Sequence, residues 1–317
     1  MRKVLSLALL LASFCYLNAQ TTRKGLQLVP SGKGYGVPAS DDSQTNDIVN
    51  PYTVHTGNGI NYHNGPVMPG TVNVYFIWYG NWVNGPKPSD TQTTVNLMNM
   101  LFGSSGLNGS GYEKINSTYG DNTHDVTGNL VLTQSITDSY SQGTRLSDNK
   151  VKSVVSRAIS NGSLPKDTNG IYFVLTSSDV NETSGFCTRY CGWHTHATIS
   201  GSDIKYSFVG NPDRCSSACE AQTISPNGDS GADGMASIMA HESEEAISDP
   251  DLNAWYDNTG QENADKCAWK FGPTTGTIGN GGYNETLAGL HWLIQMNWEN
   301  ARKGGCDQTL GGTFYNN

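Results

Sequence analysis

Basic residues are scarce in this sequence and they do not cluster. Lysine and arginine number 19 against 28 acidic residues, and the formal net charge is -9. Nucleic acids and anionic membrane surfaces are bound through concentrated patches of lysine and arginine. The sequence therefore predicts no nucleic-acid partner and no polybasic contact with a membrane.

Long apolar runs are lacking after the first twenty residues. No later stretch approaches the ~20 apolar residues of a transmembrane helix, so no membrane span is expected. The chain opens with two basic residues, an apolar run over residues 4–16, and then Leu17, Asn18 and Ala19, a pattern that signal peptidase accepts. We interpret residues 1–19 as a signal peptide, which predicts a secreted, extracellular protein beginning near Gln20.

Residues 20–51 have no apolar period and are rich in glycine, serine and aspartate. This composition is typical of a disordered arm, and a short pro-segment is the alternative. We interpret the remainder, residues 52–317, as a single α/β domain.

Cysteine is absent between Cys15 and Cys187. Once the signal peptide is removed, six cysteines remain, all in the C-terminal half: Cys187, Cys191, Cys215, Cys219, Cys267 and Cys306. An even number in an exported chain predicts three disulfides, for which about 15 connectivities are possible. We expect an apolar core to stabilise the N-terminal half and disulfides to stabilise an irregular C-terminal half.

Strand and helix patterns alternate through the first half of the domain. Strands are predicted at residues 71–79, 129–136 and 170–177, and helices at residues 91–102, after Ser89 and Asp90, and 150–159. Such alternation favours an α/β fold with a mixed sheet and covering helices.

Three further segments complete the predicted fold. Residues 193–199 and 205–210 are each short enough to be edge strands, and residues 231–247 have the spacing of a long helix. Asp249 should end that helix, because a residue before proline is disfavoured in the helical region. The order of strands and helices up to this point resembles the zincin arrangement.

The predicted helix carries an HExxE motif. His241 and Glu245 are four residues apart, so they project from one helix face at a spacing suited to two ligands of one metal. Glu242 stands where the glutamate of HExxH zinc hydrolases acts as general base. The motif predicts zinc, and its oxygen-rich character also suits manganese or calcium. The alternative is the solvated polar end of a helix.

The third ligand is left open between two aspartates. In metzincin peptidases a turn residue and a third ligand follow at fixed offsets, which hold Ser248 and Asp251 here. Asp265 is the other candidate, with Glu262 beside it, because Cys267 anchors that loop. Two departures from the metzincin pattern stand out: a glutamate replaces the second histidine, and Ser248 replaces the glycine of the turn.

Other polar and aromatic residues have two readings each. His194 and His196 should face the same side of a strand, either lining a cleft near His241 or packing as ordinary core histidines. The C-terminal tryptophans form a sugar-stacking platform or fill the core.

Five sequons predict a glycoprotein in a eukaryotic secretory pathway: Asn108, Asn116, Asn161, Asn181 and Asn284.

Several blocks, taken together, resemble a known family. Residues 62–82, 185–194, 208–219 and 225–235, together with Cys306, are similar in content and order to the blocks that define the EXORDIUM / phosphate-induced protein 1 family. The resemblance implies an extracellular, apoplast-like, cell-wall-associated protein linked in plants to growth, with no known reaction. Because plant members have no counterpart of His241, Glu242 or Glu245, it also implies a branch with a zincin-like HExxE helix.

Two functions are therefore expected. The first is a secreted zinc-dependent hydrolase, acting on peptides, with Glu242 as base and His241, Glu245 and either Asp251 or Asp265 as ligands. The second is a non-catalytic extracellular protein that binds wall polysaccharide or a partner protein and influences growth.

Overall fold

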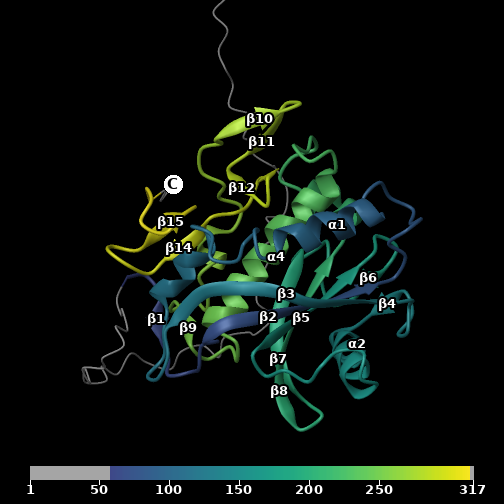
Figure 1. Cartoon of the computed structure of the whole chain (residues 1–317), viewed down its shortest axis with the longest axis horizontal. Helices are drawn as coiled ribbons and strands as arrows, with labels where there is room; N and C mark the ends of the chain where they lie inside the picture. The colour runs from purple at the N-terminus through teal and green to yellow at the C-terminus, as the bar shows by residue number, and fades with distance from the viewer. Residues whose placement is uncertain (1–57, 315–317) are drawn as a thin grey trace, which may run out of the picture.

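A five-stranded mixed sheet forms the centre of the computed structural model, which describes residues 58–314 (Figure 1). The predicted signal peptide and arm lie outside the described residues. The strands follow the order β3-β2-β5-β8-β7. In chain order they are β2 (Gly70–Tyr79), β3 (Val126–Asp138), β5 (Gly170–Thr176), β7 (Gly192–Ile199) and β8 (Ser202–Gly210).

Four strands are parallel, and β7 pairs antiparallel with β8 at one edge of the sheet. All seven residues of β5 are buried, as a continuous apolar strand inside a parallel sheet should be. The prediction that residues 205–210 form an edge strand is wrong. Strand β8 lies between β5 and β7, and seven of its nine residues are buried.

Two helices connect the first three strands, which confirms the predicted alternation. Helix α1 (Gln92–Leu101) follows β2, and α2 (Asp148–Ser160) follows β3. Thr91 occupies the N-cap position of α1. The side chain of Asp90 is instead engaged by Ser178 and Asn211, so it fixes the loop before the helix.

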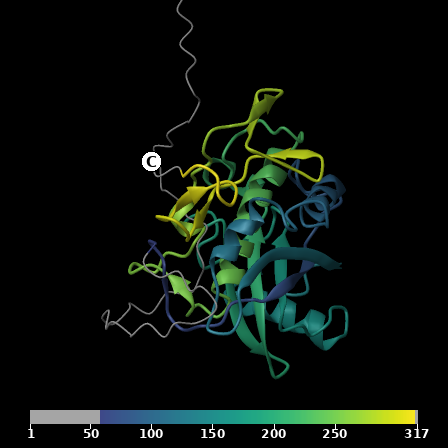
Figure 2. The ribbon, with the colours of Figure 1, turned by 60° about the vertical axis from the view of Figure 1, so that its left-hand side comes forward.

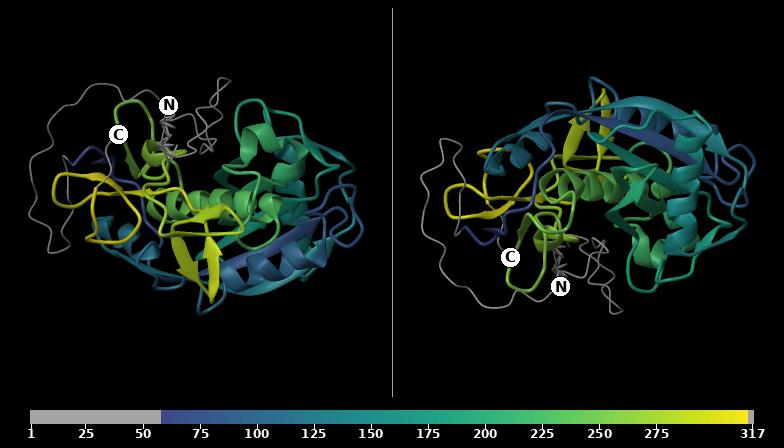
Figure 3. Two further views of the ribbon diagram at one scale, coloured as in Figure 1. Left: turned by 90° about the horizontal axis from the view of Figure 1, so that it is seen from above. Right: turned by 90° about the horizontal axis from the view of Figure 1, so that it is seen from below.

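Helix α4 (Ser230–Ser248) is the long helix predicted in the C-terminal half. Asp229 caps it by accepting a hydrogen bond from the Ala232 N–H, and it ends at the residue before Asp249, as expected. Eighteen of its nineteen residues are buried. Figures 2 and 3 show α4 between the β7–β8 end of the sheet and the C-terminal hairpins. The reading of its acidic end as solvated is therefore wrong.

Outside the central sheet and the helices α1, α2 and α4 the described elements are short, and disulfides cross-link the C-terminal half. The prediction of three disulfides is confirmed, with the pairs Cys187–Cys215, Cys191–Cys219 and Cys267–Cys306. The short helices are η1 (Glu113–Thr118), η2 (Pro212–Arg214), α3 (Ser216–Cys219) and η3 (Asp265–Cys267). Two-stranded pairs join β1 (Asn61–Tyr62) to β9 (Trp255–Tyr256), β4 (Arg145–Leu146) to β6 (Asn181–Glu182), β10 (Gly276–Ile278) to β11 (Gly281–Tyr283), β12 (Glu285–Leu287) to β13 (Leu290–Trp292), and β14 (Asn297–Glu299) to β15 (Gly305–Asp307).

Most of the tryptophans fill the core. Trp193, Trp255 and Trp292 are at most 1% exposed, so they present no face to a sugar ring. Within residues 58–314, no helix is long and apolar enough to cross a membrane.

Candidate metal centre

One face of α4 brings together the two residues of the HExxE motif. His241 Nε2 lies 2.9 Å from Glu245 Oε1, and both side chains are completely buried. This is the proximity that a spacing of four residues on a helix predicts. The motif therefore points into the protein rather than toward solvent.

Asp265 completes this group from the short helix η3. Its Oδ1 lies 3.6 Å from His241 Nε2, and its backbone N–H donates a hydrogen bond of 3.0 Å to Glu245 Oε1. The disulfide between Cys267 and Cys306 fixes the loop two residues further on. Of the two aspartates that the sequence offered, Asp265 is the one that reaches the motif.

Asp251 lies outside this group. Its Oδ1 is 3.3 Å from Lys205 Nζ and 3.6 Å from His196 Nδ1, in a partly exposed cluster that also contains Asp203. Because an ammonium group occupies this cluster, a cation has little reason to bind there. After Asp249 the chain brings Asp251 to the β7–β8 hairpin, so at the metzincin offset it stands apart from His241 and Glu245.

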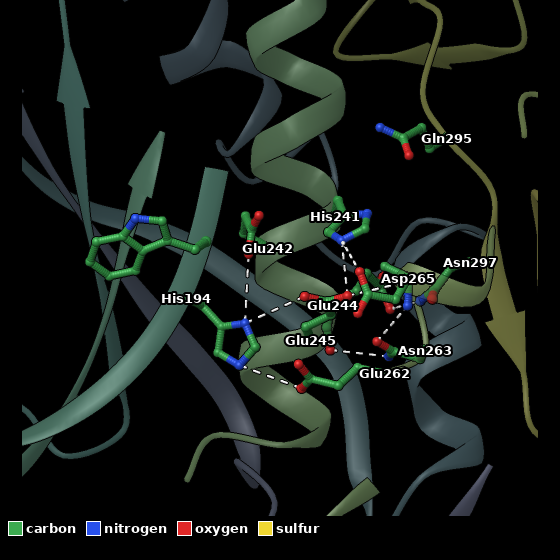
Figure 4. Close-up of polar contacts among 12 residues, drawn as sticks. His194, His241, Glu242, Glu244, Glu245, Glu262, Asn263, Asp265, Gln295 and Asn297 are labelled. Atoms are coloured by element: carbon green, nitrogen blue, oxygen red, sulfur yellow. Dashed lines mark hydrogen bonds and ion pairs between the residues drawn. The ribbon is translucent and has the colours of Figure 1, made fainter. Parts of the chain in front are cut away.

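His194 approaches the motif from strand β7 (Figure 4). Its Nδ1 lies 3.6 Å from Glu242 Oε2 and 3.5 Å from Glu245 Oε2, and its Nε2 lies 3.5 Å from Glu262 Oε1. All four side chains are at most 5% exposed. His194 is thus part of the same buried cluster as His241, and Glu245 lies between the two imidazoles.

The polar atoms of this cluster lack ordinary hydrogen bonds. Within the described residues, the following buried atoms have no hydrogen-bond partner: both ring nitrogens of His194, both ring nitrogens of His241, both carboxylate oxygens of Glu242, and the single oxygens Glu245 Oε2, Glu262 Oε1 and Asp265 Oδ1. Buried polar atoms are nearly always paired, and those that are not require an explanation such as an ion or a water molecule.

The spacing of these atoms fits a metal better than direct hydrogen bonds. Ligands about 2.0–2.1 Å from a tetrahedral zinc ion lie roughly 3.3 Å from one another. The separations of His241 Nε2 from Glu245 and Asp265, 2.9 and 3.6 Å, bracket that value. Most separations in the cluster exceed the 2.7–3.2 Å of a hydrogen bond. The donor set, one imidazole and two carboxylates, therefore fits a divalent cation.

Charges in the cluster are strongly coupled. Burial alone would raise the pKa of Glu245, but the neighbouring His241 and His194 imidazoles hold it at about 2. Burial opposes the charged form of His241, yet the carboxylates around it, Glu245 first, raise its pKa well above the ordinary value. Burial, reinforced by the Glu245 charge, raises the pKa of Asp265 to about 7. Without a metal, Glu245 is the carboxylate that keeps its charge most firmly.

A second buried acidic pair lies on another side of α4. Glu244 is next to Glu113 of η1, and Asn297 donates a hydrogen bond to Glu244 Oε2. Burial raises the pKa of Glu113 to about 8 and that of Glu244 well above its ordinary value. This pair is therefore largely protonated near neutral pH and is chemically distinct from the histidine cluster.

Comparison with known proteins identifies the family. The phosphate-induced protein 1 conserved region matches residues 60–290, which include the whole sheet, α4 and Asp265. The chain belongs to the phosphate-induced protein 1 family, which includes EXORDIUM. Among the relatives of this EXORDIUM-family chain, Protein EXORDIUM-like 3 of Arabidopsis thaliana is 33% identical, with 73% of this chain and 74% of that protein covered.

Two other relatives are more distant. Protein EXORDIUM of Arabidopsis thaliana is 29% identical, with 71% of this chain and 75% of that protein covered. Protein PHOSPHATE-INDUCED 1 of Nicotiana tabacum is 26% identical, with 62% and 67% covered. No solved structure matches the chain.

Three residues of this EXORDIUM-family chain belong to the buried clusters without a clear signal in the sequence. The sequence left His194 open between a cleft and a core position, it offered Glu262 only beside Asp265, and it gave no signal for Glu113. The alternation of β7 offered the best clue. His194 and His196 face the same side, as predicted, and both meet α4 or the loop that follows it.

Proposed function

We propose that this protein is a secreted metalloprotein of the EXORDIUM family, in which His241, Glu245 and Asp265 bind a divalent cation. The observation that carries the proposal is the convergence of three buried ligand atoms at metal-ligand spacing, several of them without a hydrogen-bond partner among the described residues. Zinc suits one imidazole and two carboxylates, and manganese or calcium is the competing ion because two of the three ligands are oxygen.

Hydrolysis of a peptide bond is the reaction that this ligand set supports best. A zinc ion with three protein ligands polarises a carbonyl group and acidifies a bound water molecule. Glu242 directly follows the first ligand, and burial raises its pKa, which makes its carboxylate a stronger base. The sheet order, with antiparallel β7 at the edge beside α4, supports the zincin-like arrangement and hence a peptide substrate.

Complete burial of Glu242 favours a second candidate function. Its side chain is 0% exposed, so a substrate could reach it only after a neighbouring segment moved. In a non-catalytic protein the ion would stabilise the packing of α4, and the outer surface would bind wall polysaccharide or a partner protein. Because Trp193, Trp255 and Trp292 are buried, fewer aromatic residues are available for stacking on sugar rings than the sequence suggested.

Metal analysis of the secreted protein tests the site. Protein purified without chelator should contain stoichiometric metal by inductively coupled plasma mass spectrometry. Loss of a residue that merely hydrogen-bonds to a metal ligand already costs roughly 10–100-fold in metal affinity, so Asp265→Asn, which alters a ligand itself, should cost at least that. Asp251→Asn is the matched control and should keep its metal. Metal-free wild-type protein, or equal losses in both variants, would overturn the proposed site.

A peptide-library digestion read by mass spectrometry tests the reaction. Cleavage should stop with chelator and return with zinc, and Glu242→Gln should slow it by roughly 10²–10⁴-fold, the usual contribution of a general base. Ser243→Ala, on the same helix, is the control and should cleave at the rate of the wild type. Metal-loaded protein that cleaves nothing, yet binds wall material in the presence of chelator, would favour the non-catalytic function.

Secretion is part of the proposal. Three disulfides require an oxidising compartment in most organisms, which supports an extracellular location. Recovery of the protein from culture medium with an N-terminus near Gln20 would bear this out, and an intact N-terminus inside the cell would contradict it.

A further inference from the structure

We infer that the buried cluster binds two cations, with Glu245 as the carboxylate that bridges them. The inference rests on the proposed function for its first position, formed by His241, Glu245 and Asp265. A second position is formed by His194, Glu242 and the other oxygen of Glu245 (Figure 4).

The geometry of the second position repeats that of the first. His194 Nδ1 lies 3.6 Å from Glu242 Oε2 and 3.5 Å from Glu245 Oε2. Both separations are too long for a hydrogen bond and close to the roughly 3.3 Å expected between ligands of one ion. Within the described residues, none of these three atoms has a hydrogen-bond partner.

Glu245 is arranged as a bridge because its two oxygens face different imidazoles. Oε1 faces His241 Nε2 and accepts one hydrogen bond, from the Asp265 N–H, which leaves a second lone pair. Oε2 faces His194 Nδ1. The two oxygens of one carboxylate thus serve separate ligand groups, as in two-metal sites whose ions are about 3.5–4 Å apart.

Glu262 gives His194 the environment of a metal ligand. Its Oε1 lies 3.5 Å from His194 Nε2, on the side of the ring opposite the proposed ion. Metal-bound histidines generally direct their second nitrogen at a carboxylate. Here the separation is longer than a hydrogen bond and neither atom has a hydrogen-bond partner among the described residues, so Glu262 contributes a carboxylate that faces the ring. An ordinary core histidine does not need three buried carboxylates around it.

The charge of the cluster is compatible with two cations. Four buried carboxylates surround the two imidazoles: Glu242, Glu245, Glu262 and Asp265. Two divalent ions neutralise them completely when both imidazoles are neutral ligands. With all four ionised, a single ion at the first position leaves one negative charge even when His194 is protonated. Burial raises the pKa of Glu262 well above its ordinary value, and protonation of Glu262 removes that charge, so the balance alone does not decide between one ion and two.

The second cation changes the role of Glu242. With both positions filled, Glu242 is a metal ligand, and it is no longer free to accept a proton from water. With one ion bound, Glu242 is a general base, and with two ions bound it is a ligand. The number of bound ions therefore decides which role Glu242 has.

Titration of the metal-free secreted protein with Mn²⁺ or Zn²⁺ tests the inference. The wild type should bind two ions per chain, and His194→Ala should bind one. His196→Ala, two residues along the same strand, is the control and should still bind two. One ion in the wild type overturns the inference while the proposed site stands, and no ion at all overturns both.

A spectroscopic measurement on the unaltered protein covers the case in which His194→Ala does not fold. Electron paramagnetic resonance of the protein with two equivalents of Mn²⁺ should show the spectrum of an exchange-coupled pair, as expected for ions bridged by one carboxylate. The six-line signal of isolated Mn²⁺ at full occupancy would overturn the bridge.

Discussion

Glu244 and Glu245 are neighbours on one buried helix, yet their replacement by glutamine should have opposite consequences. Both side chains are completely buried. Glu245 lies between two imidazoles, whereas Glu244 lies against another carboxyl group, that of Glu113. The perturbation is the single change Glu245→Gln, measured against Glu244→Gln in protein freed of metal by chelator.

The loss for Glu245→Gln can be estimated in two ways. The neighbouring imidazoles lower the pKa of Glu245 from 4.5 to about 2, and at 1.36 kcal/mol per pKa unit this corresponds to roughly 3 kcal/mol. Removing one partner of a buried ion pair costs roughly 3–5 kcal/mol. At about 2–4 °C per kcal/mol for a domain of this size class, a loss of roughly 3–5 kcal/mol should lower Tm by roughly 6–20 °C.

The sign of the pH dependence follows from the lowered pKa. Stability that comes from a carboxylate with a depressed pKa is present above the unfolded value of about 4.5 and is lost as the pH falls through about 2. The difference between wild type and Glu245→Gln should therefore be full at pH 7 and should shrink as the pH is lowered from about 4.5 toward 2.

Glu244→Gln should be nearly silent. Burial raises the pKa of Glu244 well above its ordinary value, which favours the neutral acid, and glutamine imitates the neutral acid. The amide oxygen can accept the hydrogen bond from Asn297, and the NH₂ group can donate to Glu113. We expect a change within about 1 kcal/mol, the range of a single ordinary hydrogen bond.

Denaturant unfolding and thermal unfolding of both variants, in chelator at pH 7 and again at pH 3, make the comparison. Equal destabilisation of the two variants would refute the reasoning. So would a larger loss for Glu244→Gln, or a Glu245→Gln loss that is as large at pH 3 as at pH 7.

Three further outcomes are expected. Replacing Cys267 and Cys306 together with serine should destabilise the protein by about 4 kcal/mol in denaturant unfolding, because this disulfide closes a loop with a sequence separation of 39; an unchanged midpoint would contradict this. Burial raises the pKa of Glu113 to about 8, so stability should fall as the pH rises from about 4.5 through about 8, and Glu113→Gln should flatten that fall in a pH series of melting curves. Peptide mass spectrometry of protein from a eukaryotic host should find glycan at the exposed Asn161 and none at Asn116, whose side chain is buried and donates to the Glu244 carbonyl; glycan on Asn116 in folded protein would contradict its burial.

Local patterns explain why much of the fold was predictable. The strand patterns around β2, β3 and β5 and the helical spacing of α1, α2 and α4 each depend on residues near one another in the chain. The proximity of His241 and Glu245 belongs to the same class, since helix geometry alone sets it. Asp249 ended the helix for an equally local reason.

Non-local packing explains what sequence reasoning could not settle. Whether Asp251 or Asp265 meets His241 depends on the path of the loop after α4, which no short-range pattern encodes. His194 meets Glu245 only because β7 is the antiparallel edge strand, and the mistaken edge assignment of β8 shows that strand order was not readable. The sequence left a solvated end of α4 open as the alternative to a metal site, because a run of charged residues ordinarily indicates solvent.

The positions of two disulfides connect the fold to the cluster. Cys191, three residues before His194, is bonded to Cys219 in the short helix that precedes α4, and Cys267, two residues after Asp265, is bonded to Cys306. The two segments that deliver His194 and Asp265 to α4 are therefore each cross-linked close to the residue they deliver. On the second segment the Asp265 carboxylate faces the Glu245 charge, which opposes its ionisation, since like charges repel strongly in a buried environment. The cross-links hold the carboxylates together before any cation arrives, so that binding does not also have to order the loops.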